Sequence, residues 1–269
     1  MYGRSTGMNF KDKLNRVGLS SFKVTLTLMM CLLGLLSMIY VFFTSKELFS
    51  YFYCLATVAF VVLPLALSVL FRWKLNPIFY LLFTFYTIGP LLGAVYNLYY
   101  FLSWWDSLLH MMAGAIFAVV GAQLSEVLNK NNKTSYVLSA LFGVLLSIAV
   151  AVFWEFFEYG CDVFVGSDMQ SDTVIQAIST KINRADGITD VYKNINETLV
   201  NGESIGVKGY LDIGLIDTMH DMIIETVGAM AFFVYVLIDR NRNPLISVLS
   251  ASNKNKNYIL NQNEMRANL

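Results

Sequence analysis

Nine side chains of the kinds that bind metal ions or move protons lie in three stretches of otherwise apolar sequence. They are seven carboxylates and both histidines of the chain: Asp106, His110, Glu155, Glu158, Asp162, Asp217, His220, Asp221 and Glu225. Within each stretch the spacing is mostly three or four residues, which places the side chains on one face of a helix. Carboxylate oxygens and imidazole nitrogens together suit zinc, manganese or iron. Without a metal, the same groups could share protons in a relay or an ion path.

The elements that must position these side chains are membrane-spanning helices. Of the 269 residues, 56% are hydrophobic and only 14% are charged, whereas a typical soluble domain has about 25% charged residues. A span needs about 20 apolar residues. Six segments meet this need, the third with a short turn near Tyr99 to Ser103: 24–45, 48–71, 75–105, 104–125, 135–159 and 214–238. The sequence therefore predicts an all-α fold, a polytopic membrane bundle of about six transmembrane helices.

Lysines and arginines predict the orientation of the bundle. They are concentrated in the N-terminal tail, in the connections after the second and fourth spans, and in the C-terminal tail. Because positive charge favours the cytoplasmic side, both termini are predicted to lie inside. The predicted organisation is a basic cytoplasmic tail (1–23), transmembrane helices 1–5 (24–159), an extracytoplasmic loop region (160–213), helix 6 (214–238) and a disordered cytoplasmic tail (239–269).

The loop region 160–213 is rich in Asp, Asn, Gly, Ser and Thr and contains no proline. Two of its segments, 173–182 and 190–200, are compatible with short amphipathic helices over the outer end of the bundle, or with a loop. Close helix packing is predicted at three glycines, Gly114, Gly121 and Gly228. An aromatic belt at the outer interface is predicted from Trp104, Trp105 and Trp154.

The topology brings the three polar stretches to one level of the membrane. The fourth span begins, the fifth ends and the sixth begins on the outer side, so their acids and histidines meet near the outer leaflet. Each residue alone could be an interfacial side chain that reaches water. Together they are costly in a medium of low dielectric constant, because these stretches contain no lysine or arginine to neutralise them.

A divalent metal would neutralise the acids. The candidate ligands are Asp106, His110, Glu155, Asp217, His220 and Asp221. Glu158 is the candidate catalytic residue, a general base for a water that the metal activates.

The same residues carry a family resemblance. D-S-L-L-H-M-M-A-G (106–114), W-E-F-F-E (154–158), Q-S-D (170–172) and D-T-M-H-D-M-I-I-E-T-V-G-A (217–229) resemble the pattern of the YjdF-like family of bacterial multi-pass membrane proteins. The matching positions are Asp106, His110, Gly114, Glu155, Glu158, Gln170, Asp172, Asp217, Asp221, Met222 and Gly228. The resemblance spans roughly residues 77–238. It implies a multi-pass protein of a bacterial cytoplasmic membrane and implies no activity.

Two qualifications belong to this resemblance. A weaker likeness to VanZ-like proteins rests on the Asp-to-His spacing alone. In the YjdF-like pattern the Q-x-D element lies close to the following aspartates, whereas here about 45 residues separate Asp172 from Asp217. The inserted segment could be a lid or a docking surface.

Three functions remain open from the sequence. The first is a metal-dependent enzyme that acts on a lipid-linked or envelope substrate at the outer leaflet. The second is a proton- or cation-coupled transporter, although the ionisable groups occupy only the outer halves of the spans. The third is a non-catalytic protein that docks an envelope partner through 160–213. A net charge of zero gives no support for a nucleic-acid partner. The chain contains no GxSxG, HExxH, P-loop or dinucleotide motif, so acyl-enzyme and nucleotide chemistry are unsupported.

Overall fold

The computed structural model of the chain describes residues 20–44, 48–70, 75–129, 135–182 and 185–238. The N-terminal tail up to residue 19 and the C-terminal tail (239–269) lie outside the described residues, so what the sequence predicts for them stays a prediction.

Six of the described helices are long and apolar enough to cross a membrane, which confirms the all-α, multi-pass fold. They are α2 (Ser21–Thr44), α3 (Leu48–Leu70), α4 (Pro77–Val95), α6 (Trp105–Leu128), α7 (Tyr136–Val165) and α8 (Leu215–Ile238). A short helix, α5 (Leu98–Phe101), joins α4 to α6. The third apolar run of the sequence therefore contains one span, and the chain turns at Asn97, whose φ is 62°.

Local sequence explains where two of the spans begin and end. At the start of α4 the side chain of Asn76 accepts a hydrogen bond from the N–H of Ile78, and proline occupies the first helical position, where its missing N–H costs nothing. Helix α7 continues beyond residue 159 to Val165 and stops at Gly166, whose φ of 73° suits a residue without a Cβ. Helix α7 thus extends past the predicted end of the fifth span and carries Asp162 with it.

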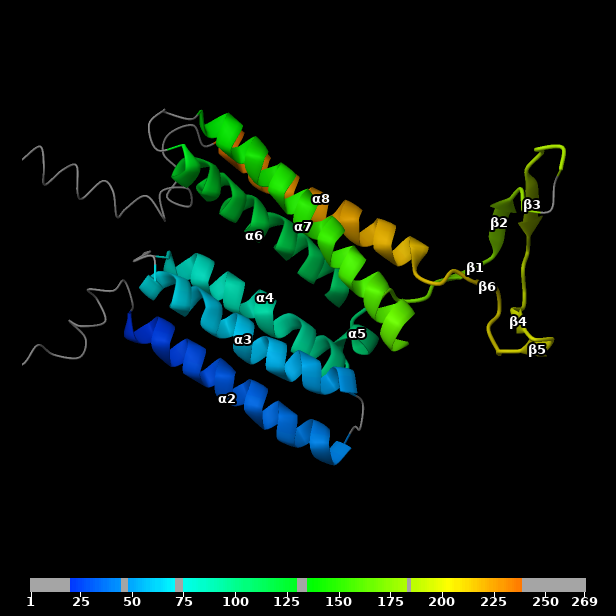
Figure 1. The fold of residues 1–269 in the computed structure, drawn as a ribbon, viewed down its shortest axis with the longest axis horizontal. Coiled ribbons are helices and arrows are strands. Elements are labelled where there is room, and N and C mark those ends of the chain that lie inside the picture. Colours follow the sequence, from blue (N-terminus) through cyan, green and yellow to red (C-terminus); the bar gives the residue numbers. More distant parts are fainter. Residues whose placement is uncertain (1–19, 45–47, 71–74, 130–134, 183–184, 239–269) are drawn as a thin grey trace, which may run out of the picture.

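The spans form two groups (Figure 1). Helices α6, α7 and α8 pack on one another, and α2, α3 and α4 pack on one another. The main contact between the groups joins α4 to α6. In the first group, small residues form a buried core around Ala118, Ala122 and Ala140, with Ala229 and Phe232 from α8. In consequence α6 is the central helix of the fold.

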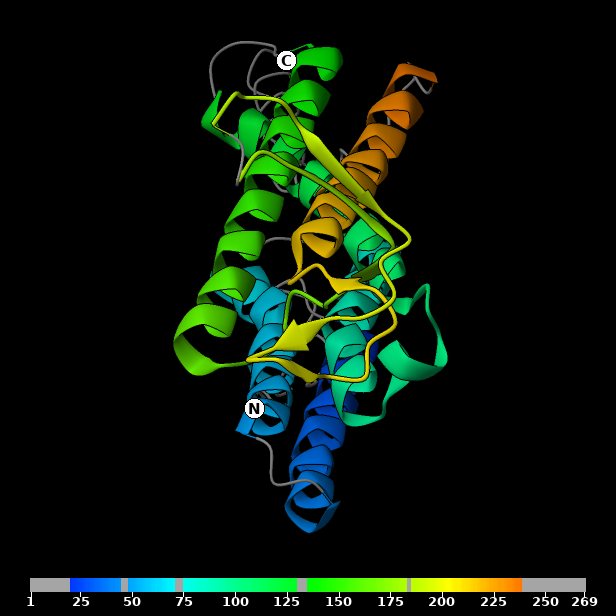
Figure 2. The same cartoon turned by 90° about the vertical axis from the view of Figure 1, so that its right-hand side faces the viewer.

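Beyond one end of the helices the chain forms short antiparallel strands (Figure 1), and Figure 2 looks onto this end with the strands in front. Strand β1 (Val174–Ile175) pairs with β6 (Tyr210–Leu211), β2 (Ala177–Thr180) with β3 (Asp190–Lys193), and β4 (Leu199–Val200) with β5 (Glu203–Ser204). The amphipathic helices considered for 173–182 and 190–200 are therefore wrong, because both segments pair as strands. Because β1 pairs with β6, the inserted segment begins and ends at the same place, beside the helix ends.

The three tryptophans near this end do not form one belt. Trp104 is exposed, but Trp105 is buried and its Nε1 donates a hydrogen bond of 3.1 Å to the carbonyl oxygen of Gly89 in α4. The prediction of a belt is therefore wrong for Trp105, which helps to join the two helix groups.

Candidate metal centre

The three polar stretches meet at the end of the bundle that carries the strands. Asp106 and His110 lie in the first two turns of α6, the glutamates lie near the end of α7, and the remaining acids lie in the first three turns of α8. Five of the side chains are buried: His110, Glu155, Glu158, Asp221 and Glu225. The arrangement places acids from three helices around one imidazole.

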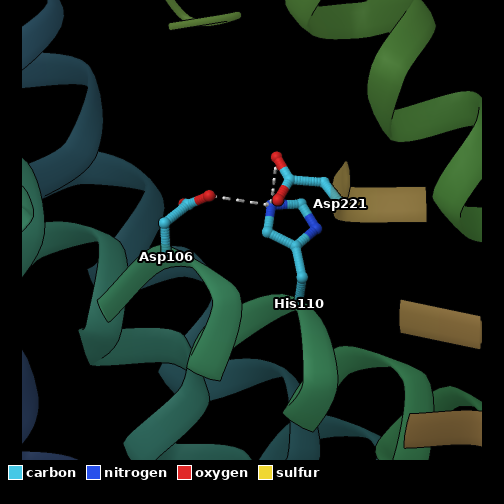
Figure 3. A group of neighbouring side chains, drawn as sticks. All are labelled: Asp106, His110 and Asp221. Atoms are coloured by element: carbon cyan, nitrogen blue, oxygen red, sulfur yellow. Dashed lines mark ion pairs between the residues drawn. The ribbon is translucent and has the colours of Figure 1, made fainter. Parts of the chain in front are cut away.

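The centre of this arrangement is His110 (Figure 3). Its Nε2 lies 3.9 Å from Oδ2 of Asp106 and 3.5 Å from Oδ2 of Asp221, and Figure 3 shows both carboxylates directed at this nitrogen. One ligand atom from each of the three residues lies within 4.8 Å of the other two. These distances are too long for hydrogen bonds. They are close to the spacing of about 3.3–3.6 Å between ligands of a tetrahedral zinc ion with bonds of about 2.0–2.2 Å.

The other nitrogen of the ring faces a further acid, to which the sequence alone assigned no role. Nδ1 of His110 lies 3.8 Å from Oε2 of Glu225. A carboxylate on the far nitrogen is the usual orienting partner of a metal-binding histidine. The signal for Glu225 was its spacing of four residues from Asp221, which puts both on one face of α8.

Several oxygens at this site are buried without a hydrogen-bond partner among the described residues. They are Oδ1 of Asp221, Oε1 of Glu225 and Oε2 of Glu155. Asp221 is only 2% exposed. Helices α6, α7 and α8 contain no lysine or arginine that could pair with these acids. A bound cation would satisfy buried carboxylates of this kind, which are otherwise costly.

The two glutamates of α7 are in different surroundings. Glu158 lines a cavity together with Asp106 and His110, and it accepts a hydrogen bond of 2.8 Å from Nε1 of Trp154. Glu155 is buried, and its Oε2 has no hydrogen-bond partner among the described residues. Glu155 is beside the His110 group and outside its set of three ligand atoms.

The structure separates two other candidate ligands from this set. Oδ2 of Asp217 accepts a hydrogen bond of 2.9 Å from the backbone N–H of Ser171, so this carboxylate ties the segment after α7 to α8. The side chain of His220 is 54% exposed, and its Nδ1 lies 3.7 Å from Oδ1 of Asp221. The two histidines thus lie near different oxygens of Asp221: His220 is near Oδ1, and His110 is near Oδ2.

The backbone approach of α6 and α8 explains why His110 faces the acids of α8. A Cβ at Gly114 would collide with the carbonyl oxygen of Glu225, and a Cβ at Gly228 would collide with the backbone of α6. Because no side chain separates the helices there, the polar residues one turn away come into contact. Ser147 of α7 donates a hydrogen bond of 3.1 Å to the carbonyl oxygen of Gly114, which adds the third helix.

The long insertion does not separate the family-pattern residues in space. Nε2 of Gln170 donates to the hydroxyl of Thr218 at 2.5 Å, and Ser171 contacts Asp217 although the two are 46 positions apart in the chain. Asp162 fixes this connection, because its carboxylate accepts hydrogen bonds from the backbone N–H groups of Met169 and Gln170.

Acidic residues continue outside the spans. Partial desolvation, followed by the charges of Asp172 and Asp162, raises the pKa of Asp168 above its ordinary value. The strand-bearing end of the bundle therefore carries further carboxylates beyond the three-residue set itself.

Comparison with known proteins gives one match. The model of a family described as "Predicted membrane protein (DUF2238)" matches residues 25–242. No curated protein and no solved structure matches the chain. The family match covers the first span from residue 25 onward, the other five spans in full and the inserted strands. The finer resemblance to YjdF-like or VanZ-like proteins stays a prediction.

Proposed function

The chain belongs to the membrane-protein family DUF2238, and we propose that it is a metal-dependent enzyme acting on a lipid-linked or envelope substrate. The observation that carries the proposal is the set of Asp106, His110 and Asp221, whose ligand atoms lie within 4.8 Å of one another in a partly buried acidic site. Zinc, manganese and iron fit this mixed oxygen and nitrogen set. The protein would work in the cytoplasmic membrane of a bacterium, with the site near the outer leaflet.

The charges of the site support a divalent ion. Two carboxylates and a neutral imidazole balance a charge of +2, and three protein ligands leave a position for a water or a substrate oxygen. If zinc were bound by these residues, it would supply hydrolytic chemistry at neutral pH, because such a metal lowers the pKa of water to about 7. Glu225 would orient the imidazole of His110 from the opposite nitrogen.

The general base in this proposal is Glu158. Its carboxylate lines the same cavity as Asp106 and His110, and Trp154 holds one of its oxygens at 2.8 Å. A side chain fixed by such a hydrogen bond can accept a proton from a water without reorganising. Glu155, with Thr218 and Gln170, would bind polar groups of the substrate at the edge of the site.

The two histidines provide a matched experiment. We expect His110→Ala to remove the metal, because it deletes the central ligand, and His220→Ala to retain it, because His220 is largely exposed and outside the set. The measurement is elemental analysis of protein purified in detergent, with Asp106→Asn as a third sample. Wild-type protein that holds no stoichiometric metal would refute the proposed centre.

Catalysis needs a separate measurement. The protein would be reconstituted in vesicles made from the total lipid extract of the expression host, and water-soluble products would be followed by mass spectrometry. We expect products that disappear on chelation and fall by about 10²- to 10⁴-fold in Glu158→Gln, which removes a general base but no ligand. Metal retained in Glu158→Gln with unchanged turnover would exclude this role for Glu158.

A further inference from the structure

A cavity of about 780 Å³ lies between the two helix groups. Its walls come from α3, α4, α6 and α7, and most of the lining side chains are apolar or aromatic, among them Phe79, Phe83 and Phe117. The acidic side chains and the histidine gather at one end, where Asp106, His110 and Glu158 line the cavity together with Glu225, whereas Gln123 lines it farther along α6. This volume falls within the range of about 300–1,000 Å³ that is typical of small-molecule sites.

The cavity is long in the direction of the spans. On α6 alone its lining extends from Asp106 to Gln123 and Leu124. With a rise of about 1.5 Å per residue, this stretch of helix is about 26 Å long. The apolar part of a bilayer is about 30 Å thick. One leaflet accounts for about half of this thickness, so the cavity is long enough for a lipid tail whose polar group lies at the metal centre.

One side of the cavity is open. Lining residues of α3 are exposed, with Phe60 at 52% and Leu63 at 40%, and so are Val120 and Leu124 of α6. The opposite wall, formed by α4, is more covered, because α4 contacts α6 directly. In a membrane-spanning bundle, an opening between α3 and α6 at this depth faces lipid and not water.

We propose that this cavity binds the hydrocarbon tail of a membrane lipid and places the headgroup of that lipid at the Asp106–His110–Asp221 centre. This inference rests on the proposed function and names its substrate class. The tail would enter sideways between α3 and α6, and the aromatic walls would bury it over most of its length. The polar end then receives the headgroup, because it is the part of the lining that offers charged side chains.

Photo-crosslinking tests the position of the tail. The protein would be placed in nanodiscs of phosphatidylethanolamine and phosphatidylglycerol that contain phosphatidylglycerol with a diazirine near the end of one acyl chain. We expect labelled peptides to include the inner wall, by which we mean cavity-lining side chains such as Phe83 and Phe117. Exposed residues that point outward, such as Leu32 and Ile39, should be labelled as well. Labelling of outward residues alone would overturn the proposal.

A matched pair of variants tests whether labelling depends on the cavity. Ala56 lines the cavity on α3, whereas Ala231 on α8 is exposed and lies outside the lining. We expect Ala56→Trp to reduce labelling of the inner wall by about tenfold by filling the space, and Ala231→Trp to leave it unchanged. Equal inner-wall labelling in both variants would overturn the proposal. The wild-type map does not depend on whether Ala56→Trp folds.

The two proposals can fail separately. Mass spectrometry of lipids extracted from purified protein would show whether the retained tail is acyl or isoprenoid. Inner-wall labelling of wild-type protein that contains no metal would support the lipid site and refute the metal centre. Bound metal without inner-wall labelling would refute the lipid site and still support the metal centre.

Discussion

The two helix groups pack by different means. Helices α6 and α8 touch through their backbones at Gly114 and Gly228, and α7 joins α6 where Gly143 lies against Ala118. Helices α2 and α4 instead contact each other through the side chains of Thr27 and Tyr80, whose hydroxyls share a hydrogen bond. Nζ of Lys23 in α2 also donates a hydrogen bond of 2.6 Å to the carbonyl oxygen of Leu75, just before α4.

The chemistry of the two groups differs in the same way. Helices α6, α7 and α8 carry the buried acids and His110, whereas α2, α3 and α4 contain no aspartate or glutamate. Backbone contact leaves little freedom for α6 and α8 to shift relative to each other. Ligands that come from separate helices need such fixed positions. Side-chain contact can adapt, which suits helices that form only the wall of a cavity. We infer that the first group positions the site and the second group encloses it.

Adding one methyl group to a glycine should cost more in the group of α6, α7 and α8 than in the group of α2, α3 and α4. At Gly114 the new Cβ would meet the carbonyl oxygen of Glu225, and the helices would have to separate. We expect Gly114→Ala to lower stability by about 2 kcal/mol, or about 4–8 °C in Tm, and to weaken metal binding. At Gly34 of α2 the nearest atoms are a side-chain methyl of Val58 at 2.8 Å and the carbonyl oxygen of Cys54 at 3.3 Å, so the backbone is less close than at Gly114. Gly34→Ala should therefore change stability by less than about 1 kcal/mol.

Thermal unfolding in detergent, together with metal content, would measure both effects. The control is Gly160→Ala in α7, where the new Cβ would have only one neighbour, 4.0 Å away. That change should raise stability by about 0.5–1 kcal/mol through helix propensity alone. Similar losses at Gly34 and Gly114 would contradict the proposed difference between the groups.

The sequence was sufficient for the spans because the first three are charge-free runs and the other three stay predominantly apolar around their acids. Hydropathy depends on no distant contact. It also placed His110 and Asp221 on helix faces at the same end of the bundle. It could not separate Asp217 from Asp221, which share one face of α8 at a spacing of four residues. The difference is a contact across 46 positions, since the N–H of Ser171 binds Asp217.

Other features were not accessible for related reasons. The strands between Val174 and Leu211 are two to four residues long, too short for an alternating pattern to be recognised. The cavity depends on which faces of α3 and α4 turn inward, and those helices are apolar on every side, so periodicity carries no information.

A smaller effect is expected from the second group alone. Tyr80→Phe removes a hydroxyl that bonds to Thr27 and lies 3.4 Å from the carbonyl oxygen of Lys23. We expect a loss of about 1–2 kcal/mol with metal content unchanged, because the contact joins α2 to α4 and is remote from the centre. The control is Tyr40→Phe, since the side chain of Tyr40 is exposed. Loss of metal in Tyr80→Phe would mean that the second group also positions the ligands.

The smallest effect concerns a contact between the groups. The rings of Phe52 in α3 and Phe157 in α7 stack with centroids 6.1 Å apart, and both side chains line the cavity. A double-mutant cycle with alanine should give a coupling free energy of about 0.5–1 kcal/mol. A cycle of Phe52 with Phe153, which is 70% exposed on the same helix, should give a coupling near zero. If the first coupling also vanished, α3 would be free to move relative to α7, and the side of the cavity open to lipid would widen without cost in stability.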